Sequence, residues 1–197
     1  TKLYFAVIAN RFKHLNLFAY LIFFMLGGIP SFLSHNSAYG EQLEDQDVDI
    51  SSGSTLSHSW QPVRELTGGP YTVNNEGTIE ATSGTIINSQ VSTSITNSGL
   101  IDGGGTGTGT SHGILFTSNS GSNSLTNSGT ISKGDSRPWL SAIRVNENST
   151  VSNITNTSTG TIKVSGATSG ASGIRVDLEN SILTELDNAG AISSTAT

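Results

Sequence analysis

The sequence contains no cysteine, only four prolines and one methionine, and charged residues make up 12% of its 197 residues. The missing cysteine excludes disulfide bridges, thiolate metal sites and a cysteine nucleophile. Charge this sparse, with aromatic residues at 7%, does not suit an ordinary cytosolic enzyme. The length corresponds to one domain or part of one. Backbone pairing and packing must therefore provide the stability of the fold.

Small polar residues, glycine and β-branched residues take the place of the missing charge. The chain has 23 glycines and many serines, threonines and asparagines. Intrinsic disorder requires high net charge and few β-branched residues, whereas valine, isoleucine and threonine are abundant here. The composition therefore indicates a folded chain rich in strands and turns.

Residues 1–40 have the order of a secretory signal peptide. They carry Lys2, Arg11 and Lys13 with no acid, then a nearly unbroken apolar run from Leu17 to Ile29, then the small-residue end Ala38-x-Gly40. An apolar run of this length is short of the roughly twenty residues that span a bilayer. We therefore expect a helical signal peptide cut between Gly40 and Glu41 rather than a retained membrane anchor. The stretch before the apolar run and the missing initiator methionine indicate a truncated or misannotated start.

We predict that the following residues, 41–70, form an acidic and polar linker that is disordered. Five acids lie between Glu41 and Ile50, without the spacing of a metal-ligand set. Removing the three basic residues of the signal from a net charge of −6 leaves −9 on the remainder. A negative exported segment argues against nucleic acid as a partner, because phosphates require a basic face.

From Tyr71 onward one short phrase recurs in the form [V/I/L]-x-N-x-G-x-I, with two extra residues in its fourth copy. Successive copies of its glycine are 22, 30, 31 and 30 residues apart. The repeated asparagine, glycine and isoleucine positions are Asn75, Gly77, Ile79, Asn97, Gly99, Ile101, Asn127, Gly129, Ile131, Asn156, Gly160, Ile162, Asn188, Gly190 and Ile192. A second phrase, with Ile114, Ile143 and Ile174, keeps the same step. Periods of this length indicate a solenoid.

The residue types favour β over α coils. The apolar clusters are short, alternate at period two, and favour isoleucine, valine and threonine. A 22-residue unit at about 3.3 Å per residue gives a perimeter of roughly 70 Å, enough for three short strands around a narrow core. We therefore predict a parallel β-helix over 71–197, with the extra residues of longer units in outward loops. The alternative is an antiparallel sandwich in which each Asn-x-Gly marks a hairpin.

Stacked coils give the repeated residues a structural role. The asparagines would form an amide ladder and the isoleucines an aliphatic stack at about 4.8 Å spacing. We expect the glycines to supply positive φ angles at sharp corners.

The signal, the acidic linker and the phrase "ITNSGLI" and its relatives resemble the beginning of an autotransporter passenger of the type V secretion family of Gram-negative bacteria. The resemblance covers the export signal and about Tyr71 to the C-terminus. It implies a right-handed parallel β-helix, displayed at the cell surface or outer membrane or released outside, with a C-terminal outer-membrane translocator barrel as its partner. No barrel pattern is present in this sequence. We therefore expect a fragment of a longer reading frame, incomplete and uncapped, rather than a broken gene whose product stays in the periplasm.

Catalytic and cofactor motifs are weak. Some passengers of this family are serine proteases, but "NSGS" from Asn119 lacks the Gly-Asp-Ser-Gly context, and the histidines are scattered. The glycine run from Ile101 to Gly113 has neither a P-loop lysine nor a repeated calcium-binding aspartate. The acids Asp102, Asp135, Asp177 and Asp187 match no common repeat position, which argues against a glycosidase pair. We predict no cofactor and no metal.

One stretch, "SKGDSRPW", is the most suggestive surface feature. Lys133-Gly134-Asp135 is similar to an integrin-type tripeptide, and Arg137 with Trp139 has the composition of a binding hot spot. The alternative is a plain Gly-Asp turn followed by a proline bend.

These observations predict an adhesin or structural stalk, linked to virulence, that binds an unknown protein or glycan on a host or bacterial surface by weak multivalent contacts. The competing hypothesis is a passenger enzyme, a serine protease or glycan-cleaving β-helix, whose catalytic residues lie outside this sequence.

Overall fold

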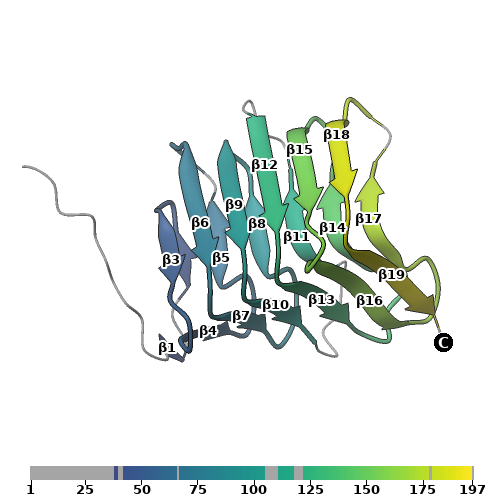
Figure 1. The fold of residues 1–197 in the computed structure, drawn as a ribbon, viewed down its shortest axis with the longest axis horizontal. Coiled ribbons are helices and arrows are strands. Elements are labelled where there is room, and N and C mark those ends of the chain that lie inside the picture. The colour runs from purple at the N-terminus through teal and green to yellow at the C-terminus, as the bar shows by residue number, and fades with distance from the viewer. Residues whose placement is uncertain are drawn as a thin grey trace, which may run out of the picture. The chain divides into compact units, whose positions relative to one another are not determined.

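The computed structural model describes residues 38–39, 42–65, 67–104, 111–117, 122–177 and 179–196. Every regular element within these residues is a β-strand, and the strands form three parallel sheets. Each coil of the chain contributes one strand to each sheet, so the fold is a parallel β-solenoid (Figure 1). The parallel pairing overturns the hairpin alternative, in which neighbouring strands would be antiparallel.

We call the three sheets A, B and C. Sheet A, along the lower edge in Figure 1, contains β1 (Ala38–Tyr39), β4 (Thr55–His58), β7 (Thr78–Ala81), β10 (Leu100–Gly103), β13 (Thr130–Gly134), β16 (Thr161–Ala167) and β19 (Ala191–Ala196). Sheet B contains β2 (Leu43–Glu44), β5 (Val63–Glu65), β8 (Ile87–Ser89), β11 (His112–Phe116), β14 (Ser141–Val145) and β17 (Ser172–Val176). Sheet C contains β3 (Val48–Ile50), β6 (Tyr71–Asn75), β9 (Thr93–Asn97), β12 (Ser122–Asn127), β15 (Thr150–Asn156) and β18 (Ile182–Asn188).

The core consists of stacks of like residues at one register. In sheet A, Ile79, Ile101, Ile131 and Ile162 lie opposite one another in successive strands and are fully buried. Ile114, Ile143 and Ile174 stack in the same way in sheet B. A buried aliphatic side chain contributes about 1.5–3 kcal/mol. Repetition of these residues from coil to coil therefore compensates for the scarcity of large hydrophobic residues.

The repeated asparagines form a hydrogen-bonded ladder at the corner between sheets C and A. The Nδ2 atom of each asparagine donates to the Oδ1 atom of the next one along the axis, over distances of 2.7 to 2.8 Å. The ladder runs through Asn75, Asn97, Asn127, Asn156 and Asn188. The amides also donate to backbone carbonyls, as Asn97 does to Thr130 at 3.2 Å. Polar side chains can therefore be buried here because their partners are buried with them.

The repeated glycines serve a different purpose from the one the sequence suggests. None of Gly77, Gly99, Gly129, Gly160 and Gly190 is among the residues with positive φ. Instead, a Cβ atom on Gly129 would lie 2.1 Å from the carbonyl oxygen of Gly99, and one on Gly99 would lie 2.1 Å from that of Gly77. Glycine is required because adjacent coils approach too closely for any side chain.

The predicted linker is also wrong for the described residues between 42 and 70. Leu43, Val48 and Ile50 are buried, and β2, β3, β4 and β5 belong to the three sheets. The acids of this segment anchor the following coil: Asp45 Oδ1 accepts a hydrogen bond from the backbone of Thr67 at 2.9 Å. The density of acids hid the alternation of apolar residues that marks a half-buried strand. The expected signal peptide and the Gly40–Glu41 cleavage site lie outside the described residues, apart from Ala38–Tyr39, which pair with β4.

The last strand of each sheet leaves core positions uncovered. Val176, Leu186 and Ile192 are 41%, 48% and 37% exposed in β17, β18 and β19, although their counterparts in the preceding coil, Val145, Ile154 and Ile162, are buried. Within the described residues, no helix has the length and apolar character needed to cross a membrane.

Candidate ligand-binding surface

The stretch predicted as an adhesive loop is only partly at the surface. Lys133 is fully buried and Asp135 is 8% exposed, so the structure does not present a Lys-Gly-Asp tripeptide outward. Gly134 ends β13 and pairs with Ser165 of β16. Trp139, by contrast, is 57% exposed. The binding surface that the sequence predicted is therefore reduced to the residues after Asp135.

Lys133 lies inside the solenoid because its neighbours are small. Lys133 pairs with Gly103 in β10 on one side and with Val164 in β16 on the other. Ala81 in β7, in the coil before Gly103, stands at the same register. A Cβ atom on Gly103 would lie 3.1 Å from Cδ of Lys133, so the missing side chain makes room for the lysine stem. Neither the inward orientation nor this fit follows from the local sequence, which places Lys133 next to a turn.

The environment of Lys133 disfavours its charged form. Burial, with a smaller contribution from Arg137, lowers the pKa of Lys133 to about 8 against the opposing effects of Asp135 and Asp102. Its Nζ atom has no hydrogen-bond partner among the described residues. Lys133 is thus a buried amine that loses its proton far more readily than an exposed lysine does.

The loop after β13 is held by two contacts to the next coil and by one internal ion pair. Arg137 Nε donates a hydrogen bond to Asp135 Oδ2 at 2.5 Å. The backbone of Asp135 donates to Ser165 at 3.1 Å, and that of Trp139 donates to Ser169 at 2.8 Å. Trp139 has a φ angle of 62°, which is uncommon for a residue other than glycine. The loop is therefore ordered in a conformation that fixes the direction of Trp139.

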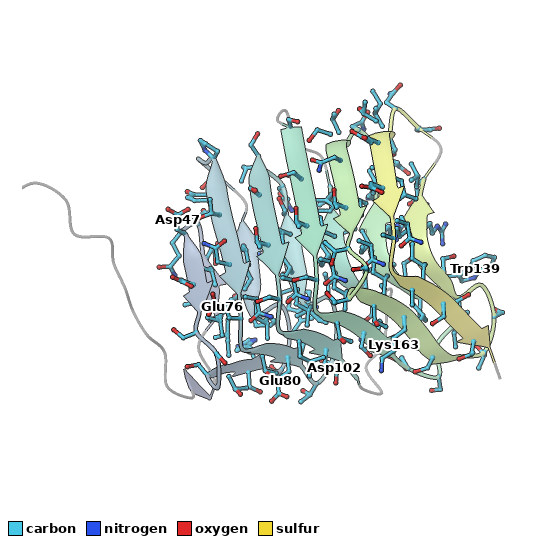
Figure 2. The ribbon with its side chains drawn as sticks, viewed as in Figure 1. Asp47, Glu76, Glu80, Asp102, Trp139 and Lys163 are labelled. Carbon is cyan, nitrogen blue, oxygen red and sulfur yellow. The ribbon has the colours of Figure 1, made fainter. Side chains whose placement is uncertain are left out.

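Trp139 packs on the next coil and lies beside a cation. A Cβ atom on Gly170 would lie 2.5 Å from its ring, so the indole fits where that glycine has no side chain. The guanidinium of Arg175 lies 5.7 Å from the ring centroid, within the range of a cation–π contact. In Figure 2 Trp139 lies near the end of the described chain, away from the acidic side chains Glu80 and Asp102.

The two arginines of β14 and β17 share one carboxylate. Arg144 Nε donates to Asp177 Oδ2 at 2.7 Å, and Arg175 Nε donates to Asp177 Oδ1 at 2.7 Å. Burial alone would raise the pKa of Asp177, but the hydrogen bonds and charges of the two arginines outweigh it and hold the pKa below its usual value. Because Arg144 and Arg175 stand at the same register in adjacent strands, Asp177 is needed to offset their repulsion.

His112 extends this network toward Lys133. Its Nε2 atom lies 2.9 Å from Nη1 of Arg144, and the residue is 1% exposed. Burial, together with the nearby Arg144 and Arg175, lowers the pKa of His112 to about 3 against the opposing effect of Asp177. An arginine can only donate, so Nε2 accepts and the histidine is neutral at physiological pH. In the sequence His112 is one of four scattered histidines, and nothing in the local pattern indicates its place beside Arg144.

The remaining sequence candidates fall elsewhere. Residues 119–121 of "NSGS" and residues 105–110 of the glycine run lie outside the described residues, and so do His14 and His35. His58 contacts the backbone of Trp60. Among the described residues no group of three or more potential metal ligands comes together.

Asp102 has a partner that the sequence comparison of the acids missed. Asp102 and Glu80 stand at the same register of β10 and β7 and line one hollow together with Ala81, Thr82 and Gly104. Figure 2 shows both carboxylates on the same lower face of the molecule. The comparison of repeat positions considered the aspartates alone, so it did not pair Asp102 with the glutamate Glu80. Asp187, in contrast, faces Thr155 in β15.

Comparison of the chain with protein-family models, with curated proteins and with solved structures gives no match.

Proposed function

We propose that this chain is an exported passenger segment of an autotransporter, which serves as a structural stalk and adhesive module and has no catalytic activity of its own. The observation that carries the proposal is the unbroken stack of parallel coils, in which core residues and the asparagine ladder repeat at one register. Such a stack is a rigid spacer, because each coil is bound to both neighbours.

We further propose that the solenoid is right-handed, since parallel crossover connections have that hand in nearly all proteins. The signal-like order of residues 1–40 supports export, and the resemblance to autotransporters supports an outer-membrane barrel as the translocation partner. The ligand of the module is a protein or glycan of a host or bacterial surface.

The adhesive function is tested by coating beads with the purified chain and counting beads retained on epithelial cells and on bacterial lawns under flow. We expect more retention than with beads coated with an unrelated β-solenoid of similar charge. If beads coated with the chain were retained no better than the control beads on every surface, adhesion would be refuted.

Export is tested separately by expressing the gene in a Gram-negative host, fractionating the cells and sequencing the N-terminus of the exported protein. We expect a new N-terminus at Glu41. Retention of the whole chain in the cytosol would contradict export. Cleavage at Gly40 would also remove Ala38–Tyr39, the strand that pairs with β4.

A further inference from the structure

The positive charge of the folded segment is concentrated around Trp139. Three of the nine basic residues of the chain lie in residues 1–40, which leaves six in the rest. Four of these six, Lys133, Arg137, Arg144 and Arg175, belong to the loop and the strands described above. The two carboxylates paired with them, Asp135 and Asp177, balance only half of that charge. Because Lys133 is fully buried, the three arginines and the two aspartates leave one uncompensated positive charge near the surface, on a segment whose net charge is negative.

The indole of Trp139 adds a flat apolar surface to this positive region. Gly170 and Arg175 both belong to the coil that follows Trp139, and both lie against the indole. More than half of the residue remains exposed. Ser136 of the same loop and Thr168 and Ser169 of the next coil are exposed as well, and the Ser169 carbonyl accepts a hydrogen bond from the Trp139 backbone.

The second tryptophan of the chain provides an internal comparison. Trp60 lies at the same corner between sheets A and B, is 54% exposed, and packs on Gly84 of the following coil as Trp139 packs on Gly170. Among the described residues, only Trp139 has a cation over its ring. Packing of tryptophan on glycine is therefore a feature of this corner, whereas the pairing with arginine is specific to Trp139.

We infer that Trp139 and Arg175 bind an acidic sugar at the end of a glycan, with the sugar ring on the indole and its carboxylate paired with the guanidinium. The inference rests on the proposed adhesive function and gives the ligand its chemical class. Aromatic side chains provide rigid contact area at low cost in entropy, and guanidinium groups recognise carboxylates by charge-assisted hydrogen bonds.

Arg175 is already oriented for this role. Within the described residues, the Arg175 side chain makes one hydrogen bond, which its Nε donates to Asp177. Its side chain remains 32% exposed. Because Asp177 fixes the guanidinium before a ligand arrives, little additional ordering is needed on binding. A single carboxylate suits this site better than a long polyanion, which the net negative charge of the segment repels.

The test follows the indole N–H signals of the purified chain by nitrogen-15 NMR, since the sequence contains only two tryptophans. Trp60→Phe assigns the two signals. The probes are methyl glucuronoside with its uncharged methyl ester, and sialyllactose with uncharged lactose; the two pairs distinguish a uronic acid from a sialic acid. A glutamate-rich peptide tests whether an acidic protein segment binds instead.

We expect saturable shifts of the Trp139 signal with one of the two acidic sugars, and affinity at least about tenfold lower for its uncharged counterpart. Isothermal titration calorimetry, which does not depend on the Trp139 signal, should show that Trp139→Ala and Arg175→Gln each weaken binding by about tenfold or more. The matched variants Trp60→Ala and Lys163→Gln should bind as the unaltered chain does. Circular dichroism establishes that each variant is folded, and Trp139→Phe, which keeps an aromatic ring, should retain part of the affinity.

The inference is wrong if neither acidic sugar shifts the Trp139 signal, if the uncharged sugars bind equally well, if the peptide alone binds, or if folded Trp139→Ala and Arg175→Gln bind normally. The bead assay separates these outcomes from the proposed function. Beads that adhere equally well with and without Trp139 leave adhesion in place and overturn the sugar site. Sugar binding without retention of beads on any surface overturns adhesion alone.

Discussion

Asn97 and Asn127 lie 30 residues apart in the chain, yet Nδ2 of Asn97 donates a hydrogen bond of 2.8 Å to Oδ1 of Asn127. Both residues are fully buried. Each internal asparagine of the ladder accepts a hydrogen bond from the asparagine before it and donates one to the asparagine after it. The ladder therefore links every coil from Asn75 to Asn188. A buried amide that loses its partner costs about 1–3 kcal/mol.

Replacing one member of the ladder should therefore destabilise the fold on both sides. For Asn127→Ala we expect the free energy of unfolding to fall by about 2–4 kcal/mol, because Asn97 Nδ2 and Asn156 Oδ1 both lose their partner. Urea denaturation followed by circular dichroism measures the change. Thr126→Ala is the matched control, since Thr126 is exposed on the same strand; an equal loss in both variants would contradict a special role for the ladder.

The contact between coils at the repeated glycines gives a second prediction. Gly99→Ala would place a Cβ atom 2.1 Å from the Gly77 carbonyl oxygen, so the backbones must move apart. We expect a loss of about 3 kcal/mol or more in the free energy of unfolding.

Gly104→Ala is the control for this substitution, because nothing lies within 4 Å of its added Cβ atom. It should change the free energy of unfolding by less than about 0.5 kcal/mol. A tolerated Gly99→Ala would show that the coils can separate freely at this corner.

The buried histidine predicts instability in acid. The pKa of His112 is about 3 in the folded chain and 6.5 in the unfolded chain, so only the unfolded chain takes up this proton between those values. The free energy of unfolding should fall as the pH drops from 6.5 toward 3, by about 3–5 kcal/mol in total. The depressed pKa of Asp177 adds a further loss as the pH falls below 3.8.

Urea midpoints between pH 7 and pH 4 measure this dependence. His112→Gln should flatten it, because an amide oxygen can still accept from Arg144 but does not titrate. His58→Gln, outside the Arg144 network, should keep the original slope. An unchanged slope in His112→Gln would place the acid sensitivity elsewhere in the chain.

Lys133 predicts a second rise of stability with pH, in the basic range. Its pKa is about 8 in the folded chain and 10.5 in the unfolded chain, so the unfolded chain binds more protons between these values. The free energy of unfolding should therefore rise with pH across this range. Lys133→Met removes the buried charge at similar volume, so it should stabilise the chain at pH 7 by about 1–3 kcal/mol and abolish the rise. Lys163→Met, at an exposed position, should neither stabilise the chain at pH 7 nor abolish the rise with pH. If Lys133→Met were less stable than the unaltered chain, the ammonium group of Lys133 would have a partner that stabilises the fold.

The sequence alone was enough to identify much of the architecture. The fixed spacing of Asn-x-Gly-x-Ile determines which residues share a register, because a solenoid repeats its contacts once per coil. The ladder from Asn75 to Asn188 and the isoleucine stacks follow from that spacing. Inside a coil, the alternation of apolar residues determines which side chains face the core.

Only the tertiary structure decided what the irregular positions do. The burial of Lys133 depends on Gly103 in the coil before it, and the position of Trp139 depends on Gly170 in the coil after it. The acidic segment after Glu41 forms strands because sheets B and C provide neighbours for it. The physical reason is the same each time: a side chain with no counterpart in the repeat takes its place from the space and charge of the adjacent coils, which a linear pattern does not contain.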